Sequence, residues 1–484
     1  QLHRTSAFHR PVESKSAKAK TDLKPSFLIH IKKTKMCIDD SLNLTSKPDG
    51  QSMESREEET GVSAGFQNDN NDPFLIDWNG FNLVDADISK SKLVDLVPEN
   101  SRLGLYPETK ISRYISPWLL SLDRQTEYEN YLNEAAEQVL AGVIYWRDNY
   151  GSEPKFTMLF NEPTTGNVEL GFDNLGAREI IDVIKKSGDL LRSEGFNEVK
   201  FIVPAEETEQ ISLNTAREIL EDSAARQYVG VIAYHPYPYG STYSYVPNIL
   251  STSGEGRPDQ AMVNIRGELK SLADTYNIPL WMTEVSHAYT FSNSDLSETV
   301  LATDFNVALG RAIHINDEFI YTGTSAYFGM NNMWNTVADV NHFPSSDGSG
   351  DTILRREHDT IALLDIAQDR IYITGMGRAI GHYSRFLSPG STRIEAESDD
   401  NRVLVTAYRD EIENRVVFVI INNNNLNKNI EINLDGISVM GTIRGEQSTE
   451  NNYWKEIEEE LNSNDKIRID LPETSITTLY ATLS

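Results

Sequence analysis

The 484-residue chain has little cysteine and little positive charge, and each shortage excludes a class of protein. Its single cysteine, Cys37, cannot form a disulfide within the chain, so disulfide bonds do not hold the fold together. Asp and Glu outnumber Lys and Arg by 73 to 44, which gives a formal net charge of −29 at pH 7. Electrostatics of that sign oppose binding to nucleic acid or to anionic membranes, and neither is expected as a partner.

Long apolar runs and cofactor motifs are missing as well. No segment approaches the roughly 18 to 20 consecutive apolar residues of a membrane span. Residues 1–20 lack the apolar core of a signal peptide. The 9 histidines form no HExxH-type cluster, and neither a Walker loop nor a GxGxxG motif follows a predicted strand. We therefore expect neither a metal nor a cofactor.

Composition divides the chain into three parts. Residues 1–60 are polar, poor in aromatic residues and slightly basic, which predicts an atypical, poorly ordered segment. Residues 61–387 alternate short apolar runs with longer amphipathic patterns, which predicts parallel strands joined by helices. Residues 388–484 contain short segments of period-two alternation separated by Asn, Asp and Gly, which predicts an antiparallel β-sandwich.

The middle part contains six strand and helix units, and two more would close an eight-stranded barrel. The only further candidate strand is the weak GVSAGF segment at 61–66. The expected fold is therefore α/β, a (β/α)8 TIM-type barrel followed by the sandwich, and the sequence leaves open whether the N-terminal strands complete the barrel. The predicted barrel strands are ISPW (115–118), KFTMLF (155–160), VKFIVP (199–204), YVGVIAY (228–234), IPLWMT (278–283) and EFIYTGTSAYFGM (318–330). The predicted sandwich strands are 393–398, 401–409, 414–423, 428–434, 465–471 and 475–483.

Two of the predicted barrel strands lead directly into a glutamate. KFTMLF is followed by Asn161, Glu162 and a proline, and IPLWMT is followed by Glu284. Functional groups of a parallel barrel gather at the carboxyl ends of its strands. The two glutamates are three strands apart, which places them on opposing walls of an eight-stranded barrel. Facing carboxylates are what glycosidic cleavage requires, since one protonates the leaving oxygen and the other attacks or supports the anomeric carbon.

Aromatic and polar residues accompany this pair. The strand between the two glutamates ends in HPYPYG, which supplies His235 and Tyr237 as possible hydrogen-bond partners of a nucleophilic carboxylate. Trp118, Trp281 and Trp334 lie near predicted strand ends, and aromatic rings stack on sugars. Each feature alone has a simpler interpretation, because strand-end glutamates are often structural, HPYPYG fits a proline-bent loop and tryptophans often pack in barrel cores. Their joint occurrence favours a glycosidase.

Together these residues resemble the clan A glycoside hydrolases, and most of all glycoside hydrolase family 30. The resemblance covers about residues 105–484. Its motifs are LFNEP around Glu162, WMTE around Glu284, AYHPYPYG at 233–240, ISPW at 115–118, GHYSRFLSPGSTRI at 381–394 and the closing LPETSITTLYATL.

The resemblance implies a retaining double displacement without metal or cofactor. Glu162 would be the general acid and base, and Glu284 the nucleophile. The negative charge of Glu284 disfavours ionisation of Glu162 until the sugar esterifies Glu284, after which Glu162 can act as a base. Asn161 would bond the sugar 2-hydroxyl, and Tyr237 or His235 would orient Glu284. A carbohydrate substrate and a monomer are expected, and the family favours secretion.

The N-terminal part departs from the family pattern. The family's barrel begins with two strands ahead of ISPW, and the second usually carries an arginine beside the nucleophile, whereas GVSAGF has none. Arg113 is the nearest candidate by strand position. Two functions remain open, an active retaining β-glycosidase and an inactive or carbohydrate-binding barrel with altered first strands. A third alternative is membership of a different clan A family that has the same two glutamates. β-Glucosides, β-xylan and β-galactan all remain compatible substrates.

Overall fold

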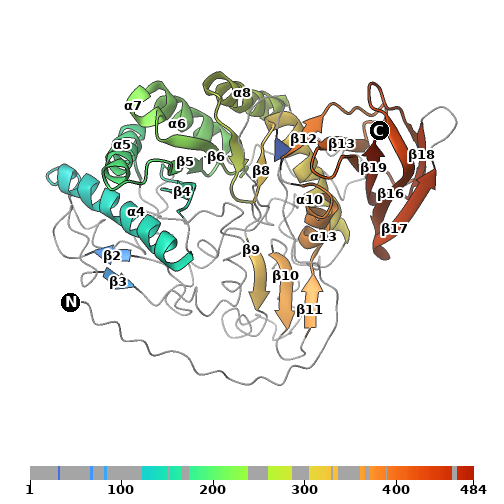
Figure 1. The fold of residues 1–484 in the computed structure, drawn as a ribbon, viewed down its shortest axis with the longest axis horizontal. Coiled ribbons are helices and arrows are strands. Elements are labelled where there is room, and N and C mark those ends of the chain that lie inside the picture. The colour runs from blue at the N-terminus through green and yellow to red at the C-terminus, as the bar shows by residue number, and fades with distance from the viewer. Residues whose placement is uncertain are drawn as a thin grey trace.

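The computed structural model places a curled α/β sheet beside a β-sandwich (Figure 1). It describes residues 31–32, 66–68, 81–83, 123–150, 153–164, 174–237, 260–285, 305–328, 331–335, 360–365, 370–388, 390–460 and 466–484. Within these residues no helix is both long and apolar enough to cross a membrane.

The α/β part contains a five-stranded parallel sheet in the order β4-β5-β6-β7-β8. Its strands are β4 (Phe156–Met158), β5 (Lys200–Glu206), β6 (Val229–Tyr234), β7 (Leu280–Met282) and β8 (Ala326–Tyr327). Its helices are α4 (Tyr128–Tyr150), α5 (Ala177–Ser193), α6 (Glu209–Glu221), α7 (Ser223–Arg226), α8 (Gln260–Tyr276) and α10 (Phe305–Asp317). The predicted alternation of strands and helices is thereby confirmed, and consecutive strands are neighbours, as in TIM-type barrels.

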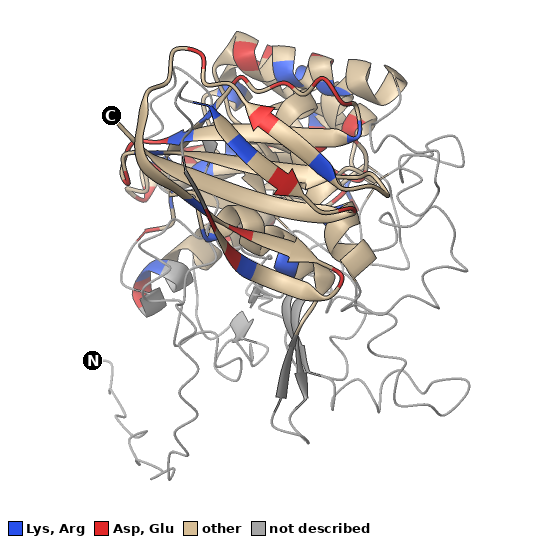
Figure 2. Ribbon diagram, turned by 90° about the vertical axis from the view of Figure 1, so that its right-hand side faces the viewer, with Lys and Arg blue, Asp and Glu red and all other residues tan. Residues whose placement is uncertain are grey.

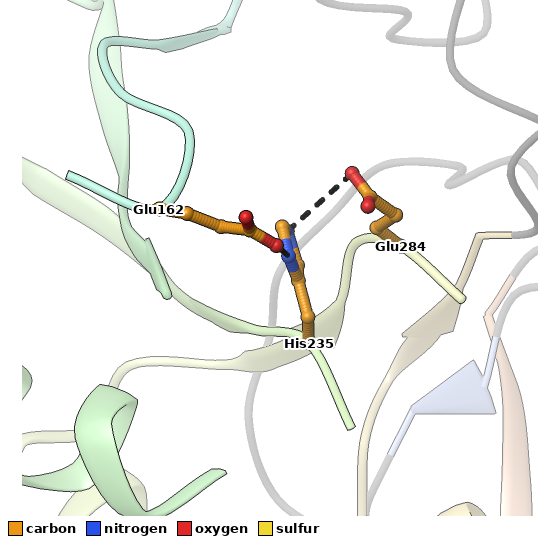
Figure 3. Close-up of side chains that lie close together, drawn as sticks. All are labelled: Glu162, His235 and Glu284. Atoms are coloured by element: carbon orange, nitrogen blue, oxygen red, sulfur yellow. Dashed lines mark hydrogen bonds and ion pairs between the residues drawn. The ribbon is translucent and has the colours of Figure 1, made fainter. Parts of the chain in front are cut away.

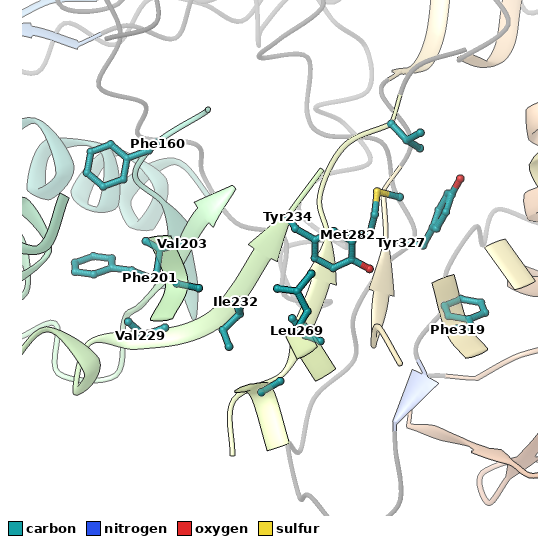
Figure 4. Close-up of a cluster of buried hydrophobic side chains, with 14 of the residues drawn as sticks. Phe160, Phe201, Val203, Val229, Ile232, Tyr234, Leu269, Met282, Phe319 and Tyr327 are labelled. Carbon is teal, nitrogen blue, oxygen red and sulfur yellow. The ribbon is translucent and has the colours of Figure 1, made fainter. Parts of the chain in front are cut away.

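Both faces of this sheet are buried, which explains the near-continuous apolar runs. Alternate residues of β5 and β6, such as Phe201 and Ile232, join a large core with the surrounding helices (Figure 4). The residues between them point to the inner face of the curl and pack with Trp281, Phe156 and Phe328. The Trp281 ring centroid lies 5.1 Å from that of Phe156 in an edge-on contact. Trp281 is therefore a core residue, as the simpler interpretation of barrel tryptophans had it.

The predicted strand 318–330 is wrong in its first part. Residues Glu318–Thr322 form a π-helix, η7, that continues α10, and Gly323 ends it in the left-handed conformation with a φ of 66°. The reason lies in Glu318, whose buried carboxylate contacts Arg266 of α8 and accepts a 2.6 Å hydrogen bond from Tyr234 of β6. These contacts hold the segment in the helical layer, so the strand is limited to β8.

Among the described residues, two smaller sheets lie outside both the parallel sheet and the sandwich. A three-stranded sheet has the order β11-β10-β9, formed by β9 (Asn331–Asn335), β10 (Thr360–Asp365) and β11 (Arg370–Ile373). Of the candidate strand GVSAGF only Phe66 is described, and it starts β2 (Phe66–Asn68), which pairs antiparallel with β3 (Phe81–Leu83). The predicted strand 115–118 lies outside the described residues.

The C-terminal part is an antiparallel β-sandwich, as predicted. One sheet has the order β1-β12-β13-β14-β19-β16-β17 and the other pairs β15 with β18. The strands are β12 (Ser391–Ile394), β13 (Val403–Asp410), β14 (Arg415–Asn422), β15 (Lys428–Ile432), β16 (Val439–Thr449), β17 (Asn452–Glu460), β18 (Ile467–Leu471) and β19 (Ser475–Leu483). β16 and β17 were missing from the predicted set because many of their side chains are polar and exposed, which weakens the period-two signal.

One short strand from the N-terminal segment joins the sandwich. β1 (Ile31–Lys32) pairs in parallel with β12 at the edge of the larger sheet. The remainder of residues 1–60, for which poor order was predicted, lies outside the described residues.

Charges of both signs are mixed on the outer face of the sandwich (Figure 2). Glu431 of β15 pairs with Lys466 and Arg468, and Arg444 of β16 lies 3.3 Å from Glu458 of β17. Exposed pairs of this kind contribute little to stability, because water and salt screen the charges. The face therefore mixes the two charges and carries no uninterrupted basic stripe along the strands drawn in this view.

Helix α13 (Gly375–Ser384) packs between the α/β part and the sandwich through a buried histidine. His382 Nδ1 lies 2.9 Å from the Thr478 hydroxyl, and Nε2 lies 2.7 Å from the Ser448 hydroxyl. Burial, with a smaller contribution from the charge of Arg385, lowers the pKa of His382 from 6.5 to about 3. The ring is therefore neutral in the folded protein throughout the ordinary pH range.

We expect this histidine to make the fold sensitive to acid. Between pH 6.5 and about pH 3 the unfolded chain takes up a proton that the folded His382 cannot, so stability falls as pH falls. The contribution is about 1.4 kcal/mol for each pH unit within this range. Urea unfolding of the wild type and of His382→Gln at several pH values between 7 and 5 measures it. The advantage of the wild type over the variant should shrink with each step, and a constant difference would contradict the prediction.

Candidate active site

Glu162 lies at the carboxyl edge of the parallel sheet, just after β4. Its backbone adopts the left-handed conformation with a φ of 49°. A non-glycine residue in this region costs about 1–3 kcal/mol and persists where its neighbours hold it. Here the Glu162 N–H donates a 2.8 Å hydrogen bond to the carbonyl of Ala205. The backbone of Ala205 is also left-handed, with a φ of 57°. The chain thus turns sharply after the strand while Glu162 remains only 9% exposed.

Glu284 reaches the same edge from β7, three strands away. The preceding residue, Thr283, donates its N–H to the carbonyl of Tyr234 at 3.0 Å, which continues the pairing of β6 and β7 beyond the strand ends. The Glu284 side chain is buried. Its Oε1 accepts a 2.8 Å hydrogen bond from the hydroxyl of Tyr237. Glu284 is therefore held by its carboxylate and by the backbone of the residue before it.

His235 stands between the two glutamates (Figure 3). It is fully buried, and its Nδ1 lies 2.8 Å from Oε1 of Glu162. Its Nε2 lies 3.9 Å from Oε2 of Glu284. Of the two residues expected to orient Glu284, Tyr237 makes the hydrogen bond to that carboxylate, whereas the hydrogen bond of His235 goes to Glu162.

The three side chains come close enough to act on one small group. One carboxylate oxygen of each glutamate and a ring nitrogen of His235 lie within 4.8 Å of one another. Two carboxylates and an imidazole could hold a divalent cation. Two carboxylates this close can also act on one sugar carbon; separations of about 5–5.5 Å are typical of retaining glycosidases and about 6.5–9.5 Å of inverting ones.

The other predicted site residues have different outcomes. Asn161 is buried directly before Glu162 at the same edge of the sheet. Trp334 lies on β9, whose backbone pairs with β10 through Leu363. Trp118 and Arg113 lie outside the described residues. Among the described residues, hydrogen bonds and close approaches connect Glu162, His235, Tyr237 and Glu284, and Asn161 adjoins Glu162 in the chain.

Two further carboxylates at this edge were missed in the sequence. Glu206 ends β5 and Glu207 follows it, and only Ala205 separates them from the predicted strand VKFIVP. Burial raises the pKa of Glu206 to about 7, and the charge of Glu162 acts in the same direction, while hydrogen bonds from Thr164 and Thr215 oppose them. Burial and the charge of Glu162 also raise the pKa of Glu207. The rule that selected Glu162, a carboxylate at a strand end, would have found both.

Comparison with known proteins agrees with this architecture. Residues 390–479 match the model of the glycosyl hydrolase family 30 beta sandwich domain. The chain resembles glycoside hydrolases of family 30. Comparison with curated protein sequences gave no match.

Solved structures share the fold at low sequence identity. A GH30 endoxylanase from Clostridium papyrosolvens C71 has a TM-score of 0.50 and 17% identity, over 74% of this chain and 71% of that one. The family 30 subfamily 8 xylanase Xyn30A from Clostridium acetobutylicum has a TM-score of 0.50 and 21% identity, over 72% of each chain. SrfJ from Salmonella typhimurium has a TM-score of 0.57 and 14% identity, over 88% of this chain and 79% of that one. The likeness to family 30 structures thus extends from the sandwich into the parallel sheet.

Proposed function

We propose that this chain is a retaining β-glycosidase in which Glu284 is the nucleophile and Glu162 the general acid and base. The observation that carries the proposal is the placement of two nearly buried carboxylates within 4.8 Å of a shared histidine nitrogen and of each other, at the carboxyl edge of a parallel sheet. The likeness to family 30 xylanases supports a carbohydrate substrate with β-linkages.

In the first half of the reaction, Glu284 attacks the anomeric carbon and the glycosidic bond breaks. Tyr237 fixes Glu284 through Oε1, which sets the direction of the attacking carboxylate. Glu162 gives its proton to the departing oxygen, so the leaving group departs as a neutral alcohol. His235 directly follows β6, two strands away from β4, and orients the acid through its contact with Oε1 of Glu162.

In the second half, water replaces the leaving group beside Glu162. The ester bond to the sugar has removed the negative charge of Glu284, and Glu162, which gave its proton to the leaving group in the first half, is now a carboxylate. Glu162 then takes a proton from water, which attacks the anomeric carbon and releases Glu284. Two inversions at one carbon give net retention of the β configuration.

The stereochemistry of the first product tests this proposal. The purified chain is offered aryl β-glucosides, β-xylosides and β-galactosides together with β-linked polysaccharides, and proton NMR follows the anomeric signal during the first minutes. We expect the β anomer to appear before mutarotation produces the α anomer. Initial release of the α anomer would exclude retention. A folded chain that hydrolyses no substrate of the panel but binds a glycan in calorimetry would favour the carbohydrate-binding alternative.

A further inference from the structure

A third carboxylate, that of Glu206, lies behind the segment that carries Glu162. Glu206 ends β5, the strand beside β4, and its side chain is fully buried. Its Oε2 accepts two hydrogen bonds from Thr164, one from the backbone N–H at 3.2 Å and one from the hydroxyl at 2.9 Å. Its Oε1 accepts a 3.3 Å hydrogen bond from the hydroxyl of Thr215. Glu206 thereby connects the residue two positions after Glu162 to helix α6.

The main chain of Glu206 supports the same site from another direction. Its carbonyl oxygen accepts the N–H of His235 at 3.0 Å, and His235 in turn contacts the carboxylate of Glu162. The hydroxyl of Ser212 donates to the same carbonyl at 3.3 Å. One residue thus fixes both the segment around Glu162 and the histidine that faces the Glu162 carboxylate.

The hydrogen bonds of the Glu206 carboxylate hold the turn that carries Glu162. Burial of a carboxylate is unfavourable unless hydrogen bonds compensate for the lost water, and burial raises the pKa of Glu206 to about 7. Glu162 must be kept in the left-handed conformation, with a φ of 49°. The carbonyl of Ala205 holds it through the Glu162 N–H, and Glu206 holds the chain two residues later. The turn is therefore fastened on both sides of Pro163.

We propose that Glu206 is a positioning residue that holds Glu162 in the orientation from which it protonates the leaving oxygen. The inference rests on the proposed function and deepens it. Without Glu206 the turn that carries Glu162 relaxes, whereas Glu284 keeps its own hydrogen bond to Tyr237 on other strands. The defect should therefore affect acid catalysis and leave nucleophilic attack largely intact, since a small misplacement of a catalytic group is costly.

Two leaving groups separate these contributions. A 2,4-dinitrophenyl group departs as a stable anion without protonation, whereas a phenyl group needs the general acid. Both β-glycosides are made with the sugar that the wild type prefers, and kcat/KM reports the step in which the leaving group departs. We expect kcat/KM for the phenyl glycoside to fall about 10-fold in Glu206→Gln and about 50-fold in Glu206→Ala. For the dinitrophenyl glycoside the loss should stay below about 3-fold.

A matched control separates positioning from general destabilisation. Thr208→Ala removes the hydroxyl that accepts the Ile211 N–H at 3.2 Å and caps α6. Thr208 is close to Glu206 in the chain, but its hydroxyl takes no part in the hydrogen bonds between Glu206 and Thr164. This variant should lower the stability of the fold and leave the ratio of kcat/KM between the phenyl and the dinitrophenyl glycoside unchanged. Glu206→Gln retains the shape of the side chain and one acceptor oxygen, so it keeps the test valid if Glu206→Ala does not fold.

The outcomes distinguish this inference from the proposed function. A selective loss on the phenyl glycoside supports it. Equal losses on both glycosides, or no loss in either Glu206 variant, would overturn the positioning role while the glycosidase remains active. A wild type that hydrolyses none of the aryl glycosides and β-linked polysaccharides would overturn the proposed function, and this inference with it.

Discussion

Replacement of Glu284 by glutamine is expected to lower kcat/KM on every glycoside substrate by about 10⁴-fold or more. The amide has nearly the same shape, but it is a far weaker nucleophile and carries no charge to stabilise the positive character that develops on the sugar. Tyr237 can still donate to the amide oxygen, so the fold of the site should survive. Steady-state kinetics of the purified variant measure the loss, and circular dichroism verifies its fold.

The control for Glu284→Gln is a glutamate-to-glutamine substitution at an exposed position. Glu268 is exposed and pairs with Arg217 at 3.2 Å, on helix α8 and not at a strand end. Glu268→Gln should keep full activity. In the wild type, a 2-deoxy-2-fluoro glycoside with a good leaving group should become attached to Glu284, and the labelled peptide can be identified by mass spectrometry. Retention of more than about one per cent of activity in Glu284→Gln, or a label on another residue, would exclude Glu284 as the nucleophile.

The strand ends of the parallel sheet were the most predictable part of the site. Apolar runs of the right length mark β4 and β7, and parallel strands bring their carboxyl ends to one edge, so Glu162 and Glu284 followed from sequence order alone. The contacts of His235 could not be predicted from the sequence order. Its ring lies between two acceptors, and the choice of Glu162 depends on side-chain conformations and on the left-handed turn after β4, neither of which the residue types specify.

The wrong strand prediction at Glu318 and the missed role of Glu206 have a different physical origin. Glu318 is part of the apolar run EFIYT, and a strand was predicted because the run is short and rich in aromatic and β-branched residues. A buried ion pair with Arg266 of α8, a helix far away in the sequence, places Glu318 in the helical layer instead. Glu206 escaped notice because its role lies in contacts with Thr164 and Thr215, which come from two other segments. Tertiary contacts of this kind leave no periodic signal in the sequence.

Replacement of Glu162 by alanine is expected to have a large effect of a different form, because both halves of the reaction use this residue. With a phenyl leaving group the first step loses its acid, and kcat/KM should fall by about 10²- to 10⁴-fold. With a 2,4-dinitrophenyl leaving group the first step needs no acid, so the loss should concentrate in the second step, where water lacks its base. The glycosyl-enzyme then accumulates, which lowers kcat and KM together.

Added azide distinguishes this prediction from a simple loss of folding. Azide is a nucleophile that needs no base, and the space left by the Glu162 side chain, beside His235, lies on the face from which water would attack. We expect azide to raise kcat of Glu162→Ala at least about 10-fold on the dinitrophenyl glycoside and to yield the β-glycosyl azide, because the anion opens the Glu284 ester with a second inversion. An α-glycosyl azide would instead indicate attack on the substrate itself, without a Glu284 ester. Absence of any rescue in a folded variant would contradict the role of Glu162 as the base.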